Sequence, residues 1–186
     1  MTTRQTSLLP ERAGAHASDD AQMREFLGFV LGDERYALPL SAIREILRLP
    51  PVTEVPRGPE DVLGIISVRG QVTTLIDMRL RLRMPRKAID SRTRVLLVER
   101  GGEVLGLLVD RVLQVFRMRE DEMELASVLG ADASAYVMGI GRPGSRRAVA
   151  SGEHIREHVV DGQATELGDI LILLDPMALL KPYGVD

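Results

Sequence analysis

The chain has 186 residues with 24 Lys and Arg against 27 Asp and Glu, a net charge of −3, and no cysteine. This charge balance offers no basic face for phosphates, so we expect no nucleic-acid partner. The lack of cysteine excludes disulfides, thiolate catalysis and cysteine-based metal centres, and it fits a reducing cytoplasm. No apolar run approaches the ~20 residues that span a bilayer, and no signal-peptide core occurs, so we expect a cytoplasmic protein without direct membrane insertion.

Residues 1–22 are polar and have no period, which is typical of a disordered tail. From residue 23 onward, short apolar and β-branched runs follow one another between turn signals such as Arg69-Gly70. The predicted strands cover 25–31, 34–40, 62–68, 71–77, 93–99, 103–109, 112–117, 136–141 and 169–174. Many short strands at close spacing favour an all-β sandwich or barrel.

A short helix is expected after the second predicted strand. Ser41 is a suitable N-cap, because its hydroxyl can accept a hydrogen bond from the first free backbone N–H groups. Ile43, Ile46 and Leu47 then follow at a spacing that places them on one helical face. The sequence therefore predicts a helical turn with an apolar face at this point.

Two further helical turns are expected after later strands. Asp77 is a predicted N-cap for the turn that follows it, and Asp175-Pro176 combines a capping carboxylate with proline at the first helical position. The second of these turns should continue to Leu180. Between the first helix and the next strand, four prolines in 49–59 predict an extended connector.

The pattern of runs and turns occurs twice. Residues 32–34 align with 101–103 at an offset of 69, and the apolar runs on both sides stay in register. Later matches are 64–65 with 139–140, at an offset of 75, and 75–78 with 173–176, at an offset of 98. The increase predicts about 23 extra residues in the second copy, at about 142–166. We expect two small barrels from this duplication, whose halves are related as about 24–82 and 93–182.

Two histidines offer the best case for a metal site. On a helix, His154 and His158 would share one face, and Glu153 and Glu157 could complete a ligand set. Gly152 and the weak helical period argue against this arrangement, and Glu does not directly follow the first histidine. We therefore expect a solvated loop and no metal, and we keep a small metal-dependent hydrolase as the alternative.

Three carboxylates stand at strand ends, where paired acid–base catalysis would need them. Asp77, Asp110 and Asp175 each follow an apolar run and precede an expected turn, so we expect them to accept backbone N–H bonds instead. No serine lies in a nucleophile elbow and no glycine-rich phosphate loop follows a strand. The sequence favours a binding protein, without cofactor, over an enzyme.

Arg69 lies in a tight turn between two apolar strands, where Gly70 can adopt a positive φ. It could be an ordinary soluble turn residue. It could equally present a guanidinium on a rigid turn to a carboxylate or backbone carbonyls of a partner. Spacing alone leaves both interpretations open.

Several stretches, in this order, resemble the CheW family of bacterial chemotaxis coupling proteins. They are 24–36, 43–46, 62–79, 104–110 and 136–141. The resemblance extends over about 24–141 and 168–182. It implies two SH3-like five-stranded β-barrels that share an interface, with a few short helices and no catalysis.

The resemblance also implies partners. CheW-like proteins connect the cytoplasmic tips of methyl-accepting chemoreceptors to the regulatory domain of a CheA-type histidine kinase, in membrane-associated receptor arrays. The implied receptor-binding residues are Ile43, Glu45, Ile46 and Arg69. The two isoleucines would accept the apolar stripe of a receptor helix, and the charged pair would fix its register.

The sequence departs from the family pattern in places. Ser67 and Val68 replace the usual Asn-Leu before Arg69, and Thr74 stands where proline is common. The larger departure is the predicted insertion at 142–166. It leaves open whether the kinase belongs to chemotaxis or to a parallel pathway of motility or development, served by an adaptor of the same fold.

Overall fold

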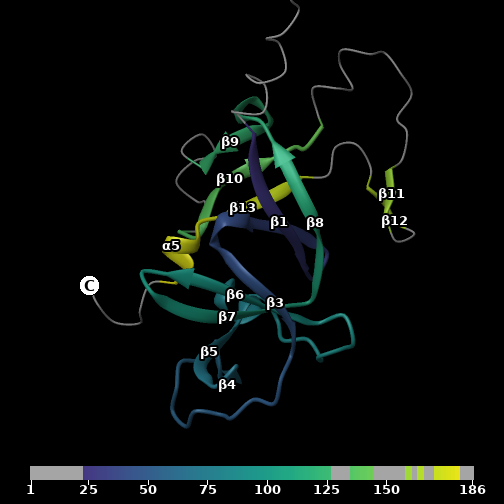
Figure 1. Cartoon of the computed structure of the whole chain (residues 1–186). Helices are drawn as coiled ribbons and strands as arrows, with labels where there is room; N and C mark the ends of the chain where they lie inside the picture. Colours follow the sequence, from purple (N-terminus) through teal and green to yellow (C-terminus); the bar gives the residue numbers. More distant parts are fainter. Residues whose placement is uncertain (1–22, 127–134, 145–157, 161–162, 166–169, 181–186) are drawn as a thin grey trace, which may run out of the picture.

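The computed structural model describes residues 23–126, 135–144, 158–160, 163–165 and 170–180, which are mostly strands (Figure 1). The first part of the chain contains β1 (Arg24–Leu31), β2 (Glu34–Pro39), β3 (Ile43–Arg48), β4 (Val62–Val68), β5 (Gln71–Asp77), β6 (Arg94–Arg100) and β7 (Glu103–Val109). The second part contains β8 (Arg111–Met118), β9 (Met123–Leu125), β10 (Val137–Gly141), β11 (His158–Val160), β12 (Gln163–Thr165) and β13 (Leu171–Leu174). Short helices are the 3₁₀ turns η1 (Leu40–Ala42) and η2 (Glu120–Glu122) and the single-turn helices α2 (Met78–Arg81) and α5 (Pro176–Leu179).

The predicted all-β class with a few short helices is confirmed. Each of the nine predicted strands is present, with ends that differ by at most two residues. The connector over 49–59 is also confirmed, with a single β-bridge between Thr53 and Ile65. The tail at 1–22 and most of the insertion at 142–166 lie outside the described residues.

The predicted helix after Ser41 is wrong. Only η1 forms there, its N-cap is Pro39, and no side chain caps it. From Ile43 the chain is the strand β3, which pairs antiparallel with β6. Sheet pairing with a strand that lies about 50 residues later outweighs the local helical spacing, because β-branched residues also fit a pleated edge strand.

The other two helix predictions are confirmed. Asp77 caps α2 through its carboxylate, which accepts hydrogen bonds from the backbone N–H groups of Arg79 at 2.9 Å and Leu80 at 3.4 Å. Asp175 caps α5 by accepting from the N–H of Met177 at 2.7 Å, with Pro176 at the first helical position.

The two large sheets share one strand order. One sheet runs β8-β1-β2-β13-β10-β9 and the other runs β3-β6-β7-β5-β4. The offsets of the sequence repeat pair β1 with β6, β2 with β7, β3 with β8, β4 with β10 and β5 with β13. When each strand of the five-stranded sheet is replaced by its match, the order becomes β8-β1-β2-β13-β10, which is the order of the six-stranded sheet without β9. A parallel pair lies inside both sheets, β5 with β7 in one and β13 with β2 in the other.

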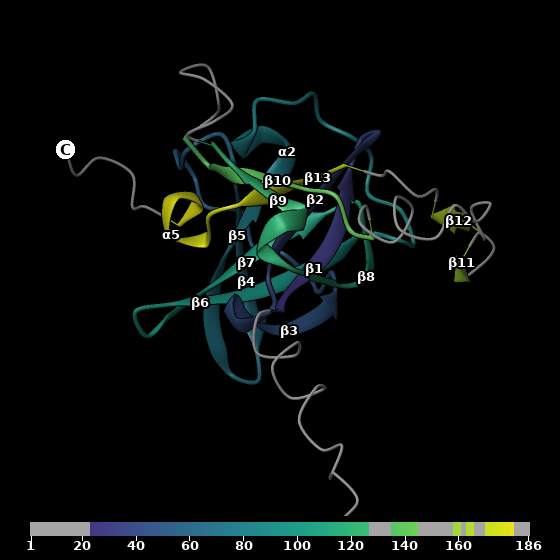
Figure 2. The ribbon, with the colours of Figure 1, turned by 90° about the horizontal axis from the view of Figure 1, so that it is seen from above.

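Each sheet therefore contains strands from both copies of the repeat. The first copy gives β1 and β2 to the six-stranded sheet, and β3, β4 and β5 to the other. In Figures 1 and 2 the two sheets pack against one another, and the β11–β12 hairpin lies to one side of both. The limits of the halves, 24–82 and 93–182, stay a prediction, but their strands are interlocked.

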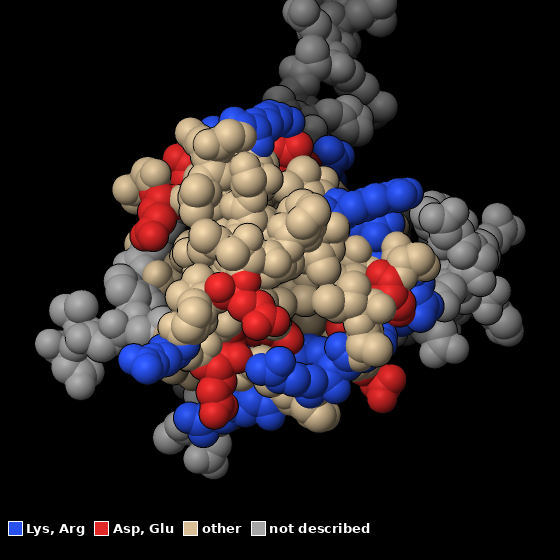
Figure 3. All heavy atoms as spheres, turned by 90° about the horizontal axis from the view of Figure 1, so that it is seen from below, with Lys and Arg blue, Asp and Glu red and all other residues tan. Residues whose placement is uncertain are grey.

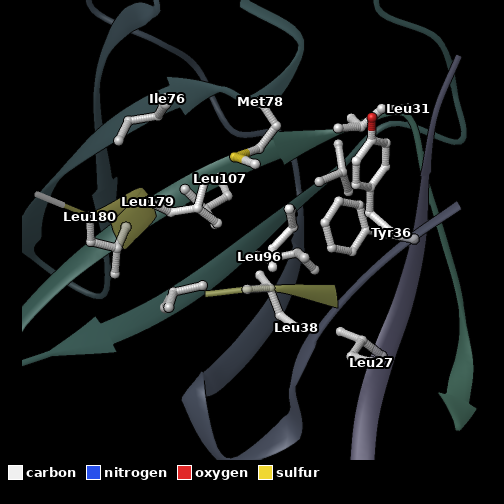
Figure 4. Packing of buried hydrophobic residues seen from close by; sticks show 14 residues of the cluster. Leu27, Leu31, Tyr36, Leu38, Ile76, Met78, Leu96, Leu107, Leu179 and Leu180 are labelled. Carbon is white, nitrogen blue, oxygen red and sulfur yellow. The ribbon is translucent and has the colours of Figure 1, made fainter. Parts of the chain in front are cut away.

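A shared hydrophobic core lies between the sheets. Figure 4 shows side chains from β1, β2, β6, β7 and the helices α2 and α5 meeting there. Phe29 and Tyr36 stack with ring centroids 6.0 Å apart. Smaller clusters lie within each sheet: one includes Phe26, Ala37, Phe116, Met118, Leu171 and Leu173, and the other Ile66, Leu75, Val95, Leu97 and Leu108. This arrangement of two local cores and a common one fits two small barrels joined along an apolar interface.

Candidate functional site

The turn between β4 and β5 places Arg69 in a strained conformation. Val68 and Gln71 form the last strand pair, and the two residues between them have positive φ, 51° for Arg69 and 83° for Gly70. Positive φ at both positions defines a type I′ hairpin turn. The positive φ expected for Gly70 is confirmed. A left-handed conformation costs a residue other than glycine about 1 kcal/mol, so the hairpin holds Arg69 in place at a cost.

Arg69 forms an ion pair with Glu45 across the five-stranded sheet. The Arg69 Nη2 and Glu45 Oε1 atoms are 2.8 Å apart. Glu45 lies on β3, at one edge of that sheet, and the β4–β5 hairpin forms the other edge. The sheet must therefore curl until its two edges approach, as in a barrel. The Arg69 side chain is 80% exposed, so solvent screens this pair and its contribution to stability is small.

The two isoleucines do not share a face. Residues along β3 alternate between half-buried and exposed, and the register shifts between Ile43 and Glu45. Ile43 packs against the shared core, whereas Ile46 is 43% exposed. The prediction that Ile43, Ile46 and Leu47 share one apolar face is therefore wrong, because it depended on a helix. The structure brings Glu45 and Arg69 together and leaves Ile46 as the exposed apolar residue of β3.

Val72 belongs to the same hairpin and was missed by the sequence reasoning. It is 73% exposed and pairs with Ser67 on β4. The signal was present, because alternation from the buried Leu75 and Thr73 places Val72 on the outward side of β5. Figure 3 views the end of the molecule that carries β4 and β5, and it shows a largely uncharged area bordered by charged side chains of both signs.

A surface hollow lies where the six-stranded sheet meets the start of β3. Its volume is about 680 Å³, and it is lined by Met23, Arg24, Glu25, Phe26, Pro39, Leu40, Ser41 and Arg117. Arg117 Nε and Glu25 Oε1 are 2.8 Å apart at its rim, and the guanidinium of Arg24 lies 5.6 Å from the centre of the Phe26 ring. Because Leu40 and Ser41 belong to η1 and Ile43 follows it directly, the hollow adjoins the start of β3.

A second ion pair is structural. The Asp110 carboxylate accepts hydrogen bonds from Arg79 Nε at 2.8 Å, from Arg79 Nη2 at 2.5 Å and from the backbone N–H of Gly32 at 2.9 Å. Both side chains are 11% exposed. Asp110 accepts a backbone N–H bond, as predicted, but the predicted capping of a following turn is wrong, because the strand β8 and not a helix follows it. The pair instead ties α2 to the β1–β2 and β7–β8 turns.

The electrostatics of this pair follow from its geometry. Burial would raise the pKa of Asp110, but the hydrogen bonds from Arg79 and Gly32 and the positive charge of Arg79 outweigh it, and the pKa is lowered. The hydrogen bond to Asp110 raises the pKa of Arg79. Both groups are therefore held in their charged forms, as a bidentate pair requires.

The metal hypothesis is untested. His154 lies outside the described residues, and of His158 only the backbone, in β11, is described. Within the described ranges, no group of three or more His, Cys, Asp and Glu is placed to hold a metal ion. Over those same ranges, no helix is long and apolar enough to cross a membrane.

The fold and the exposed turn define a class: a binding protein built from two SH3-like β-barrels. The family model of the CheW-like domain matches residues 25–182. This match covers most of the chain, and the protein therefore belongs to the CheW-like family of chemotaxis scaffolding adaptors.

Individual relatives agree with this assignment. The chain is 31% identical over 134 residues to the chemotaxis protein CheW of Helicobacter pylori, covering 72% of this chain and 81% of that protein. It is 32% identical over 134 residues to the protein FrzA of Myxococcus xanthus, covering 72% and 82%. The fold is also that of the scaffolding protein TtCheW from Thermoanaerobacter tengcongensis, with a TM-score of 0.67, 23% identity, and coverage of 87% and 95%.

Proposed function

We propose that this protein couples the cytoplasmic tips of chemoreceptors to the regulatory domain of a CheA-type histidine kinase, without catalysing a reaction itself. It would act in the cytoplasm and be recruited to membrane-associated receptor arrays. The observation that carries the proposal is the exposed Arg69, which is held on a strained turn and paired with Glu45 in a chain of the CheW-like family.

The receptor contact would centre on β3 and the β4–β5 turn. Arg69 retains free donors besides the one bonded to Glu45, since a guanidinium has five N–H groups. These donors could bind carbonyl or carboxylate oxygens of a receptor helix, while Ile46 contacts its apolar stripe. Ile43, which packs inward, would support β3 and contribute less contact area.

The receptor contact can be tested with Arg69→Glu. The purified protein and a soluble cytoplasmic fragment of a cognate receptor would be titrated by calorimetry. We expect at least a tenfold loss of affinity, about 1.4 kcal/mol, because the new carboxylate lies beside Glu45 and repels it as well as any receptor carboxylate.

Arg57→Glu provides a matched control. Arg57 is also exposed and also has a positive φ, 60°, but it lies in the connector away from the hairpin turn. The same charge change on the same backbone conformation should leave receptor affinity within about twofold. Equal losses of receptor affinity in both variants would show that the receptor-binding site does not lie at the β4–β5 turn.

The kinase contact requires a separate measurement. Titration with the regulatory domain of a cognate CheA-type kinase should give saturable binding near a 1:1 ratio. The similarity to FrzA, whose name does not mention chemotaxis, supports a kinase of a parallel pathway as the second candidate. Binding to that kinase alone would select the second candidate, and binding to neither would contradict the coupling role.

A further inference from the structure

The connection from α2 to β6 is unusually basic. Residues 83–92, here named the basic loop, contain Arg83, Arg86, Lys87 and Arg92, all exposed, against the single acidic residue Asp90. The whole chain carries a net charge of −3. A loop with a surplus of three positive charges on an acidic protein is a local feature that solubility does not require.

The basic loop is anchored to the rest of the fold. At its start, Met84 donates its backbone N–H to the Arg79 carbonyl at 2.7 Å, and the Pro85 carbonyl accepts from Arg79 Nη1 at 3.1 Å. Arg79 is itself fixed by Asp110. In the middle, Arg86 Nη2 donates to the Glu60 carbonyl at 3.3 Å.

The end of the basic loop is an Asx-type turn. The Asp90 carboxylate accepts from the N–H groups of Arg92 at 2.7 Å and Thr93 at 3.2 Å, and the Thr93 hydroxyl accepts from the Asp90 N–H at 3.0 Å. The hydrogen bond from the Arg92 backbone N–H, together with the Arg92 guanidinium, lowers the pKa of Asp90. The loop therefore presents its side chains from a fixed backbone, so little ordering entropy would be lost on binding.

Most of its positive charge is not neutralised within the described structure. Lys87 and Arg92 share Asp90, at 3.8 Å and 3.3 Å, and Lys87 Nζ also lies 3.6 Å from Asp110, whose charge Arg79 already balances. Among the described residues, the Arg86 guanidinium has a carbonyl oxygen and no carboxylate as its partner. Arg83 has a positive φ of 60°, and its guanidinium has no partner among the described residues.

An exposed apolar residue lies between these charges. Ile89 is 59% exposed and follows Ala88, which is also exposed. Single exposed apolar residues are common on protein surfaces, so the relevant feature of Ile89 is that cationic residues lie on both sides of it in the loop. Flanking charges with an apolar centre are the usual composition of a recognition surface.

We propose that the basic loop is a docking surface for an acidic segment of a partner protein, which carries an apolar side chain to cover Ile89. The carboxylates of that segment would pair with Arg83, Arg86 and Arg92. A lipid surface fits less well. The loop offers one large exposed apolar residue and four cations, and the neighbouring carboxylates of Glu60 and Asp90 offset part of that positive charge, so adsorption to a membrane would be weak. The inference does not depend on the receptor site, which involves other residues.

The test uses a fluorescently labelled peptide of glutamates with one central leucine, and the full-length protein. Fluorescence anisotropy at 50 mM NaCl should give saturable binding that weakens at 300 mM, as expected for exposed ion pairs. Arg83→Gln, Arg86→Gln and Arg92→Gln together should lower the affinity about tenfold or more. Ile89→Ser should lower it about threefold for the leucine peptide, with no change for an all-glutamate peptide.

The matched control neutralises three exposed arginines elsewhere, Arg44→Gln, Arg57→Gln and Arg117→Gln. It should bind the peptide within about twofold of wild type, and both triple variants should keep the wild-type far-UV circular dichroism. Equal losses in the two triple variants would reveal non-specific attraction and overturn the proposal. So would binding to vesicles with 30% phosphatidylserine, lost in the loop variant, without binding to the peptide.

Discussion

At the scale of single residues, Asp110 connects segments of the structure that its position in the sequence does not suggest. It receives three hydrogen bonds from Arg79 and Gly32, which belong to segments far from it along the chain. Asp110→Ala would leave the Arg79 guanidinium buried without its counter-charge. We expect a loss of about 3 kcal/mol in the free energy of unfolding, measured by urea denaturation.

Glu99→Gln is the comparison for that loss. Glu99 pairs with Arg44 at 3.7 Å, and both side chains are about half exposed. Because solvent screens such a pair, the substitution should change the unfolding free energy by less than about 0.5 kcal/mol. Similar effects at Glu99 and Asp110 would contradict the special role of the buried pair.

The lowered pKa of Asp110 makes part of the stability depend on pH. A carboxyl whose folded pKa lies below its unfolded value stabilises the fold fully above the unfolded pKa, about 3.9, and this contribution is lost as pH falls through the folded pKa. The stability difference between wild type and Asp110→Asn should therefore be largest near neutral pH and shrink below about pH 4. Denaturation curves between pH 7 and pH 2.5 check this, and a difference independent of pH would refute it.

At the scale of elements, two glycines at equivalent places in the two copies of the repeat allow a neighbouring backbone segment to approach the strand closely. Gly64 on β4 and Gly139 on β10 each sit at a register shift, and a Cβ on either would overlap a backbone carbonyl oxygen, that of Thr53 or Glu124. Gly64 also has a φ of 147°. We expect Gly64→Ala to lower the unfolding free energy by about 3 kcal/mol, because the connector must move away from β4.

Gly102→Asn is the control for this prediction. Gly102 has a φ of 86°, a Cβ added to it would meet no atom within 4 Å, and asparagine tolerates that conformation. Its effect should stay below about 1 kcal/mol in the same denaturation assay. If Gly64→Ala were as mild, the connector would be loosely attached to β4.

The strands that the sequence predicts correctly are bounded by clear turn residues. The strand β3 was instead predicted as a helix, because the local spacing of apolar residues does not show which strand pairs with it. Ile43, Ile46 and Leu47 have a helical spacing, yet the same residues fit an edge strand with a bulge. Only β6, distant in the sequence, decides between the two. For the same reason Asp110 looked like a cap: its partner Arg79 lies 31 residues away. The tight turn had already singled out Arg69, but Glu45 came from family resemblance alone. The contact between the two side chains also depends on how the sheet closes.

At the scale of the whole molecule, the interlocked repeat determines how the protein folds. Each sheet draws strands from both copies, and the shared core joins side chains such as Phe29, Leu96 and Leu174. Neither copy can complete a sheet from its own residues. The long-range pairs, such as β1 with β8, must therefore form before either local core is closed.

The protein should consequently unfold in one cooperative transition. Leu173→Ala and Leu75→Ala empty space in the two local clusters, one in each sheet. Each should lower the unfolding free energy by about 2–5 kcal/mol, and each should move the whole transition. Circular dichroism, which reports all strands, and tyrosine fluorescence, to which Tyr36 in the shared core contributes together with Tyr136 and Tyr183, should give coincident curves. If either variant separated the two curves, one sheet could fold without the other, and the exchange of strands would not couple them.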